Sequence, residues 1–160
     1  MVDEVFIPKI NSWLSRHGFS NATTKFDYEF CYAIDDAVIS IGVVDYDEMG
    51  DWFKDFLKEN GYDFSFIPYP ILAFLHELGH HNTINAFSNE DLKYFSIVKE
   101  LIPSDNEKEQ LFIYWSFPDE LAATRWLAEY VTTHMEDVAE LTEIFLSTWD
   151  NVIDEVWEAL

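Results

Sequence analysis

The chain contains few basic residues, a single cysteine and no long apolar run. It has 9 Lys and Arg against 31 Asp and Glu, so its formal net charge is −22 at pH 7. Such a surface repels phosphate groups, which argues against direct nucleic-acid binding and against anionic membranes. Because Cys31 has no partner for an internal disulfide, a reducing, cytoplasmic setting is expected. No stretch is apolar for about 18 residues, so we expect no membrane span.

Apolar and aromatic residues are abundant despite this charge. Hydrophobic residues make up 49% of the chain and aromatic residues 18%. Disordered acidic tails lack such content, so we expect a folded core, organised as one domain over residues 1–160. The first residues carry acids instead of the Lys or Arg that open a secretory signal, which agrees with a cytoplasmic protein.

Periodicity predicts a small sheet followed by helices. Apolar residues recur at helical spacing in several segments, which are 4–17, 47–60, 70–85, a segment capped by Ser88 and most of 110–160. Alternation over 25–34 predicts a strand, and the β-branched run 38–44 predicts its hairpin partner across Asp35 and Asp36. The expected fold class is α+β, with a small N-terminal antiparallel or mixed sheet and a mainly helical C-terminal half.

The most informative motif is HELGH at 76–80, an HExxH sequence within the apolar helix predicted at 70–85. Four helical residues turn by about 400°, which puts His76 and His80 on one face. Two imidazoles so placed can bind one Zn²⁺, and Glu77 beside them can act as general base on a water activated by the ion. The alternative is an exposed pair of histidines, which the apolar surroundings disfavour because buried imidazoles need polar partners.

A catalytic zinc ion also needs a third protein ligand and an open position. The HExxHxxGxxH continuation is absent, because Thr83 and Ala86 occupy its glycine and histidine positions. Glu120 is the preferred ligand, since it opens a predicted helix in which the small Ala123 permits close approach to the motif helix. A solvated carboxylate, favourable in any first helical turn, is the alternative interpretation of Glu120. Glu100 is the reserve candidate.

The motif and the downstream segment together resemble a known family. HELGH at 76–80, followed some 40 residues later by Glu-x-x-Ala-x-x-aromatic at 120–126, resembles the gluzincin type of zincin metallopeptidases, and most of all ImmA/IrrE-type proteins of bacteria and their mobile elements. The resemblance implies that the two motif histidines and Glu120 hold zinc and that Glu77 is the base. It also implies a zincin-like core and a cytoplasmic peptidase that cuts regulatory proteins such as repressors. The chain departs from the family at 126–127, where Phe-Ala is usual.

Two further parts of a peptidase site can be sought in the sequence. Tyr114, Tyr130 and His134 are near enough in sequence to donate to the oxyanion of the reaction, but each is more often a core or surface residue, so none is assigned. A peptide substrate commonly adds as a strand at a sheet edge. The candidate edges are 38–44 and 62–66.

The acidity supports a second hypothesis, a binding protein without catalysis. Residues 119–160 contain eleven acids and one Arg, interleaved with apolar residues at helical spacing. A phage or mobile-element protein of this kind could act as an acidic inhibitor or DNA mimic on a zincin scaffold, with a basic or DNA-binding protein as partner. The simpler interpretation is a pair of amphipathic helices with a solvated acidic face. Trp149 and Trp157 could also pair two subunits.

Overall fold

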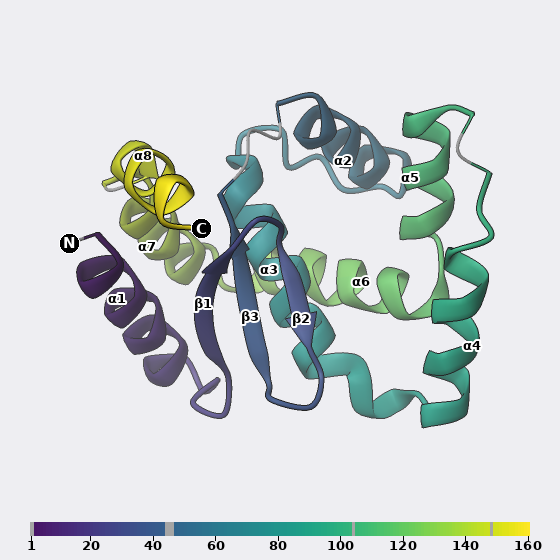
Figure 1. Cartoon of the computed structure of the whole chain (residues 1–160), viewed down its shortest axis with the longest axis horizontal. Coiled ribbons are helices and arrows are strands. Elements are labelled where there is room, and N and C mark those ends of the chain that lie inside the picture. Colours follow the sequence, from purple (N-terminus) through teal and green to yellow (C-terminus); the bar gives the residue numbers. More distant parts are fainter. Residues whose placement is uncertain (1, 44–46, 104, 148) are drawn as a thin grey trace.

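The computed structural model describes residues 2–43, 47–103, 105–147 and 149–160. The protein is α+β, with one three-stranded mixed sheet near the N-terminus and helices in the C-terminal half, as the sequence predicts (Figure 1). Its elements in chain order are α1 (Val2–Arg16), β1 (Thr23–Asp27), β2 (Cys31–Ala33), β3 (Val38–Gly42), α2 (Asp47–Glu59), α3 (Tyr69–Thr83), the 3₁₀ turn η1 (Ile84–Ala86), α4 (Asn89–Lys99), α5 (Glu107–Trp115), α6 (Pro118–Thr133), α7 (Met135–Leu146) and α8 (Trp149–Ala159).

Strand β3 lies in the middle of the sheet. The order is β1-β3-β2, with β1 parallel and β2 antiparallel to β3. Ile39 and Ile41 on one face of β3 and Ser40 on the other are all buried, which explains why this β-branched run contains no charged residue. The predicted hairpin is present between β2 and β3, where Ala33 pairs with Val38.

Two predictions about strands are wrong. Segment 25–34 is not one strand, because β1 ends at Asp27 and β2 begins at Cys31. The chain leaves the sheet between them, since β2 pairs on the opposite side of β3 from β1. Segment 38–44 is not an edge, because its described part contains the central strand β3, while residue 44 lies outside the described residues. Segment 62–66 contains no strand. An edge of this sheet is therefore β2.

Helix α3 occupies the middle of the molecule. Its residues from Ile71 to Leu75 are buried, and it contacts β2 and β3 of the sheet as well as α2, α6 and α7 (Figure 1). The backbones of α3 and α6 meet at Gly79 and Ala123, so a small residue in α6 does permit the close approach expected from the sequence. Among the described residues, every helix is too short or too polar to cross a bilayer.

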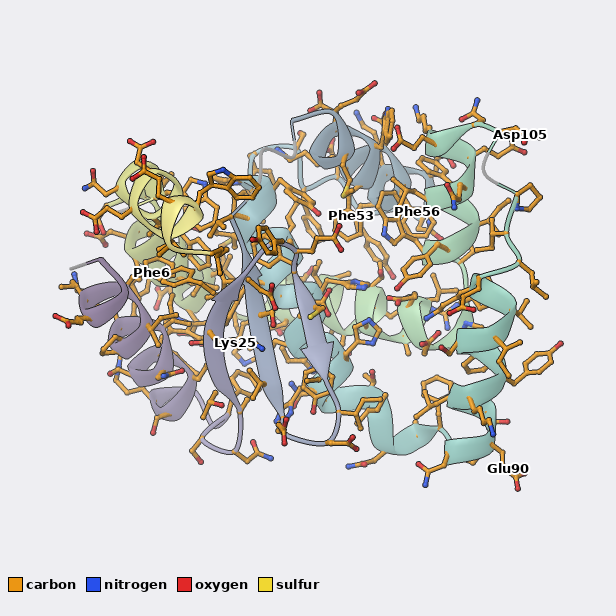
Figure 2. The ribbon with its side chains drawn as sticks, viewed as in Figure 1. Phe6, Lys25, Phe53, Phe56, Glu90 and Asp105 are labelled. Carbon is orange, nitrogen blue, oxygen red and sulfur yellow. The ribbon has the colours of Figure 1, made fainter. Side chains whose placement is uncertain are left out.

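Aromatic side chains form the core on both sides of α3. Phe6 from α1 packs edge-on against Phe145 from α7 with 5.0 Å between ring centroids. On the other side of α3, Phe53 and Phe56 from α2 (labelled in Figure 2) pack around Trp115 from α5. Their ring centroids lie 5.0 and 5.5 Å from that of Trp115. These contacts hold α2 and α5 together, and residues of both helices line a cleft along α3.

Candidate metal centre

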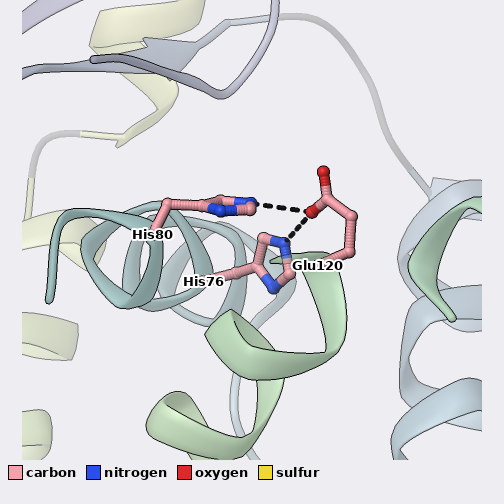
Figure 3. A group of neighbouring side chains, drawn as sticks. All are labelled: His76, His80 and Glu120. Atoms are coloured by element: carbon pink, nitrogen blue, oxygen red, sulfur yellow. Dashed lines mark hydrogen bonds and ion pairs between the residues drawn. The ribbon is translucent and has the colours of Figure 1, made fainter. Parts of the chain in front are cut away.

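Helix α3 carries His76 and His80 on one face, one turn apart. The side chains are 8% and 11% exposed, and the two ring planes are perpendicular with centroids 4.8 Å apart. The i, i+4 spacing in a helix explains why both lie on the same side. Each ring directs Nε2 toward the start of α6 (Figure 3).

Glu120 meets both imidazoles. It lies in the first turn of α6, which Pro118 begins, and its side chain is 6% exposed. Its Oε2 is 2.9 Å from His76 Nε2 and 2.7 Å from His80 Nε2 (Figure 3). One ligand atom from each residue lies within 4.8 Å of the others. The structure thus brings together the three residues proposed from the sequence, in a buried group that could hold a metal ion.

The second nitrogen of His76 also has a partner. Its Nδ1 is 3.2 Å from Oγ1 of Thr124, which is completely buried in α6. A hydroxyl can donate or accept, so it can accept from a protonated Nδ1 and leave the lone pair of Nε2 available to an ion. No role for Thr124 was predicted from the sequence. Its position four residues after Glu120, on the same face of the helix, is the feature of the sequence that indicates it.

A partly buried ammonium group completes the surroundings of Glu120. Lys99, the last residue of α4, places Nζ 2.8 Å from Asp119 Oδ2 and 3.1 Å from Glu120 Oε1. Its side chain is 14% exposed. Neither Lys99 nor Asp119 was predicted from the sequence, and no spacing rule identifies Lys99, because α4 meets α6 only through the tertiary fold.

The protonation of the group reflects these contacts. Burial alone would raise the pKa of Glu120, but hydrogen bonds with His76 and His80 hold that pKa well below its usual value. Burial alone would lower the pKa of His80, but its hydrogen bond to Glu120 and the carboxylate charge raise it. The carboxylate therefore stays ionised, as a metal ligand must.

The charges of the group favour a divalent cation. Glu77, next to His76 on α3, faces the same cleft, where burial raises its pKa. Asp119 and Glu120 add two further carboxylate groups, and the ammonium of Lys99 contacts both of them. Unbalanced negative charge is unfavourable in a buried site, and a divalent ion would offset it.

The group lies at the floor of a cleft of about 590 Å³. One wall is apolar and includes Met49, Phe53 and Trp115, and Phe53 packs edge-on against His76 with 5.6 Å between centroids. The lining also includes residues of the edge strand β2, among them Tyr32. Apolar side chains and a sheet edge therefore both border the cleft.

The edge strand is tied to α3 by hydrogen bonds. His81 Nε2 is 2.9 Å from Asn21 Oδ1, and His81 Nδ1 is 2.9 Å from the hydroxyl of Tyr32. Because Asn21 Oδ1 is an acceptor, Nε2 carries the proton and Nδ1 accepts from Tyr32 O–H. His81 thus bonds to residues outside the metal-ligand group and ties β2 to α3.

The remaining candidates from the sequence lie in different places. Tyr114 lines the cleft, where burial and the charge of Glu120 raise its pKa. Tyr130 stacks on His134, with ring centroids 4.4 Å apart, and neither residue lines the cleft. Glu100 is exposed after the end of α4 and is not part of the metal-ligand group. Only Tyr114 among these candidates is placed to reach a ligand in the cleft.

The chain matches no protein-family model, no curated protein and no solved structure. The geometry of the cleft and of the group at its floor is therefore the basis for assigning a function.

Proposed function

We propose that this protein is a zinc-dependent peptidase of the HExxH type, as its resemblance to ImmA/IrrE-type gluzincins suggests. The observation that carries the proposal is the convergence of His76 Nε2 and His80 Nε2 on Glu120 Oε2, at 2.9 and 2.7 Å, in the floor of a cleft. Two imidazoles and one carboxylate, with space left for a further ligand, are the donor set typical of catalytic zinc.

Zinc and Glu77 contribute in different ways to the proposed peptide hydrolysis. When bound, zinc lowers the pKa of a water molecule toward neutrality and polarises a carbonyl group. Glu77 accepts a proton from the attacking water and delivers it to the amine that leaves. Its raised pKa suits this exchange, because a general base works best when its pKa is near the working pH.

The cleft fits an extended polypeptide. Edge strand β2 offers backbone hydrogen-bonding groups beside the metal-ligand group, so a substrate segment can add to the sheet there. The apolar wall with Phe53 and Trp115 can receive an apolar side chain next to the bond that is cut. On the resemblance, the substrate is a cytoplasmic regulatory protein.

Metal content and peptide cleavage together test this proposal. We expect about one zinc ion per chain by mass spectrometry, lost in His76→Ala and in Glu120→Ala but kept in the exposed control His134→Ala. Glu77→Gln should keep zinc and lose cleavage of a library of quenched fluorescent peptides. An active Glu77→Gln protein would disprove the role of Glu77. Absence of zinc after reconstitution would disprove the metal centre.

A second candidate function is binding to a basic protein. It is favoured by the outward position of the acids on α7 and α8: Glu136, Glu143, Asp154 and Glu158 are exposed, whereas Val138, Leu141, Phe145 and Val152 are buried. Such a face can attract a DNA-binding domain or steer a basic substrate. In that case the protein should compete with DNA for a basic DNA-binding domain. Competition that weakens as the salt concentration rises would support this second function, and competition unaffected by salt would contradict it.

A further inference from the structure

The two carboxylate oxygens of Glu120 have different partners. Oε2 is shared by the Nε2 atoms of His76 and His80. Oε1 accepts a hydrogen bond from Lys99 Nζ at 3.1 Å, and the same ammonium donates to Asp119 Oδ2 at 2.8 Å. Only one oxygen of Glu120 therefore faces the position where the metal ligands converge.

Lys99 is held in place from several sides. Its Nζ lies 4.8 Å from the ring centroid of Tyr114 and 5.8 Å from that of Phe117, so the ammonium rests against two aromatic faces. Asp119 is 8% exposed, and within the part of the chain that the structure describes its Oδ1 is buried without a hydrogen-bond partner. A carboxylate buried at this cost depends on the ammonium of Lys99 that it contacts.

We propose that Lys99 and Asp119 form a clamp that makes Glu120 bind the metal ion through Oε2 alone. A free carboxylate can turn to offer both oxygens to an ion, and the second oxygen would then occupy a position needed by water or substrate. The ammonium of Lys99 prevents this turn by engaging Oε1, and Asp119 fixes the ammonium. The inference rests on the metal centre of the proposed function but not on its peptidase activity.

Electrostatics and geometry predict opposite effects of removing Lys99. The ammonium and a metal ion have charges of the same sign, so charge alone predicts that the ion binds more tightly without Lys99. The clamp predicts weaker binding, by roughly 10- to 100-fold, because groups that orient a ligand commonly have effects of that size. The direction of the change therefore decides between the two.

The test compares Lys99→Met with Lys93→Met. Lys93 is an exposed residue of the same helix, so its substitution changes the net charge equally and leaves Glu120 untouched. Zinc affinity would be measured by competition with a chromophoric chelator, and the ligand number by visible absorption of the Co²⁺-loaded protein. We expect Lys99→Met to bind zinc more weakly and to give the weaker absorption of a higher ligand number, while Lys93→Met resembles the wild type.

Two further variants keep the test decisive if Lys99→Met folds poorly. Lys99→Arg retains a cation that can reach both carboxylates and should restore most of the affinity and the spectrum. Asp119→Asn removes the anchoring charge without touching Glu120 and should weaken zinc binding less than Lys99→Met does. Circular dichroism and melting of the metal-free variants would verify that each is folded.

The outcomes separate the clamp from the proposed function. If Lys99→Met and Asp119→Asn bind zinc as tightly as the wild type, with an unchanged Co²⁺ spectrum, the clamp is disproved and the metal centre stands. If the wild type binds neither ion, both the metal centre and the clamp are disproved. Cleavage of peptides enters neither conclusion, so a failure of the peptidase assignment is detected separately.

Discussion

A Cβ atom on Gly79 would lie 2.5 Å from the carbonyl oxygen of Ala123 and 3.0 Å from its Cα. Gly79 stands within the HELGH motif, so the absence of a side chain there lets α6 bring Glu120 against the two histidines. Replacing Gly79 by Ala should force the two backbones apart and lower the free energy of unfolding by roughly 1–3 kcal/mol. Urea denaturation followed by Trp fluorescence would measure the change.

Gly50→Ala is the matched control for this substitution. It also adds a methyl group to a helical glycine, but the new Cβ would meet side-chain atoms of Tyr69 at 3.0 Å and not a backbone. Both substitutions gain about 1 kcal/mol of helix propensity, so the difference between them reports how much more the contact with the α6 backbone costs than the contact with Tyr69. Equal stabilities of the two variants would contradict the packing argument.

The metal-ligand group could be predicted from the sequence because local rules determine most of it. The i, i+4 spacing fixes how His76 and His80 face each other, and the start of a helix after Phe117 fixes where Glu120 stands. Lys99 could not be predicted, because it reaches the group from α4, whose position depends on packing over the whole chain.

The order of the strands could not be predicted for the same reason. Alternation along 25–34 describes side chains that take turns facing a core, and it continues through residues that leave the sheet. Strand β3 lies between β1 and β2, so the chain must cross from one side of β3 to the other between Asp27 and Cys31. The alternation of residue types does not reveal this crossing. The prediction that 38–44 forms an edge is wrong for a related reason. Strand β3 is buried on both faces, and such a strand lies in the middle of a sheet.

Thr124 should matter for metal binding although it cannot touch the ion. Thr124→Val keeps the shape of this fully buried side chain and removes the partner of His76 Nδ1. We expect zinc affinity to fall by roughly 10-fold or more, because the ring loses the contact that orients it. Thr142→Val is the control, since the Thr142 hydroxyl donates to a backbone carbonyl in α7, away from the cleft. Chelator competition on both variants would provide the comparison, and unchanged affinity in Thr124→Val would contradict the role of Thr124.

The bond between Tyr32 and His81 should stabilise the edge strand. Tyr32→Phe keeps the ring and removes the hydroxyl that donates to His81 Nδ1. We expect a loss of about 1 kcal/mol in the free energy of unfolding and faster amide hydrogen exchange in β2. Tyr94→Phe, which removes a hydroxyl from an exposed residue of α4, should change neither quantity. Unaltered exchange in β2 after Tyr32→Phe would show that the strand is held by other contacts.

The effect of zinc on stability should depend on pH through His80. Burial lowers the pKa of His80, but Glu120 outweighs burial and raises it above the usual value of 6.5. The metal-free protein therefore gains stability from protonated His80 at pH values below 6.5 and loses this contribution as the pH rises through the raised pKa. Zinc needs the neutral imidazole, so its affinity changes in the opposite direction.

We accordingly expect the zinc-induced rise in Tm to grow as the pH increases from below 6.5, because the proton stops competing for the site once the pH passes the raised pKa of His80. Calorimetric melting of metal-free and zinc-loaded protein across this range measures the rise directly. His134→Gln should show the same dependence as the wild type, because that exposed histidine is not part of the metal-ligand group. A rise in Tm that stays constant with pH would mean that zinc binds without displacing a proton from His80, and the ligand assignment would have to be revised.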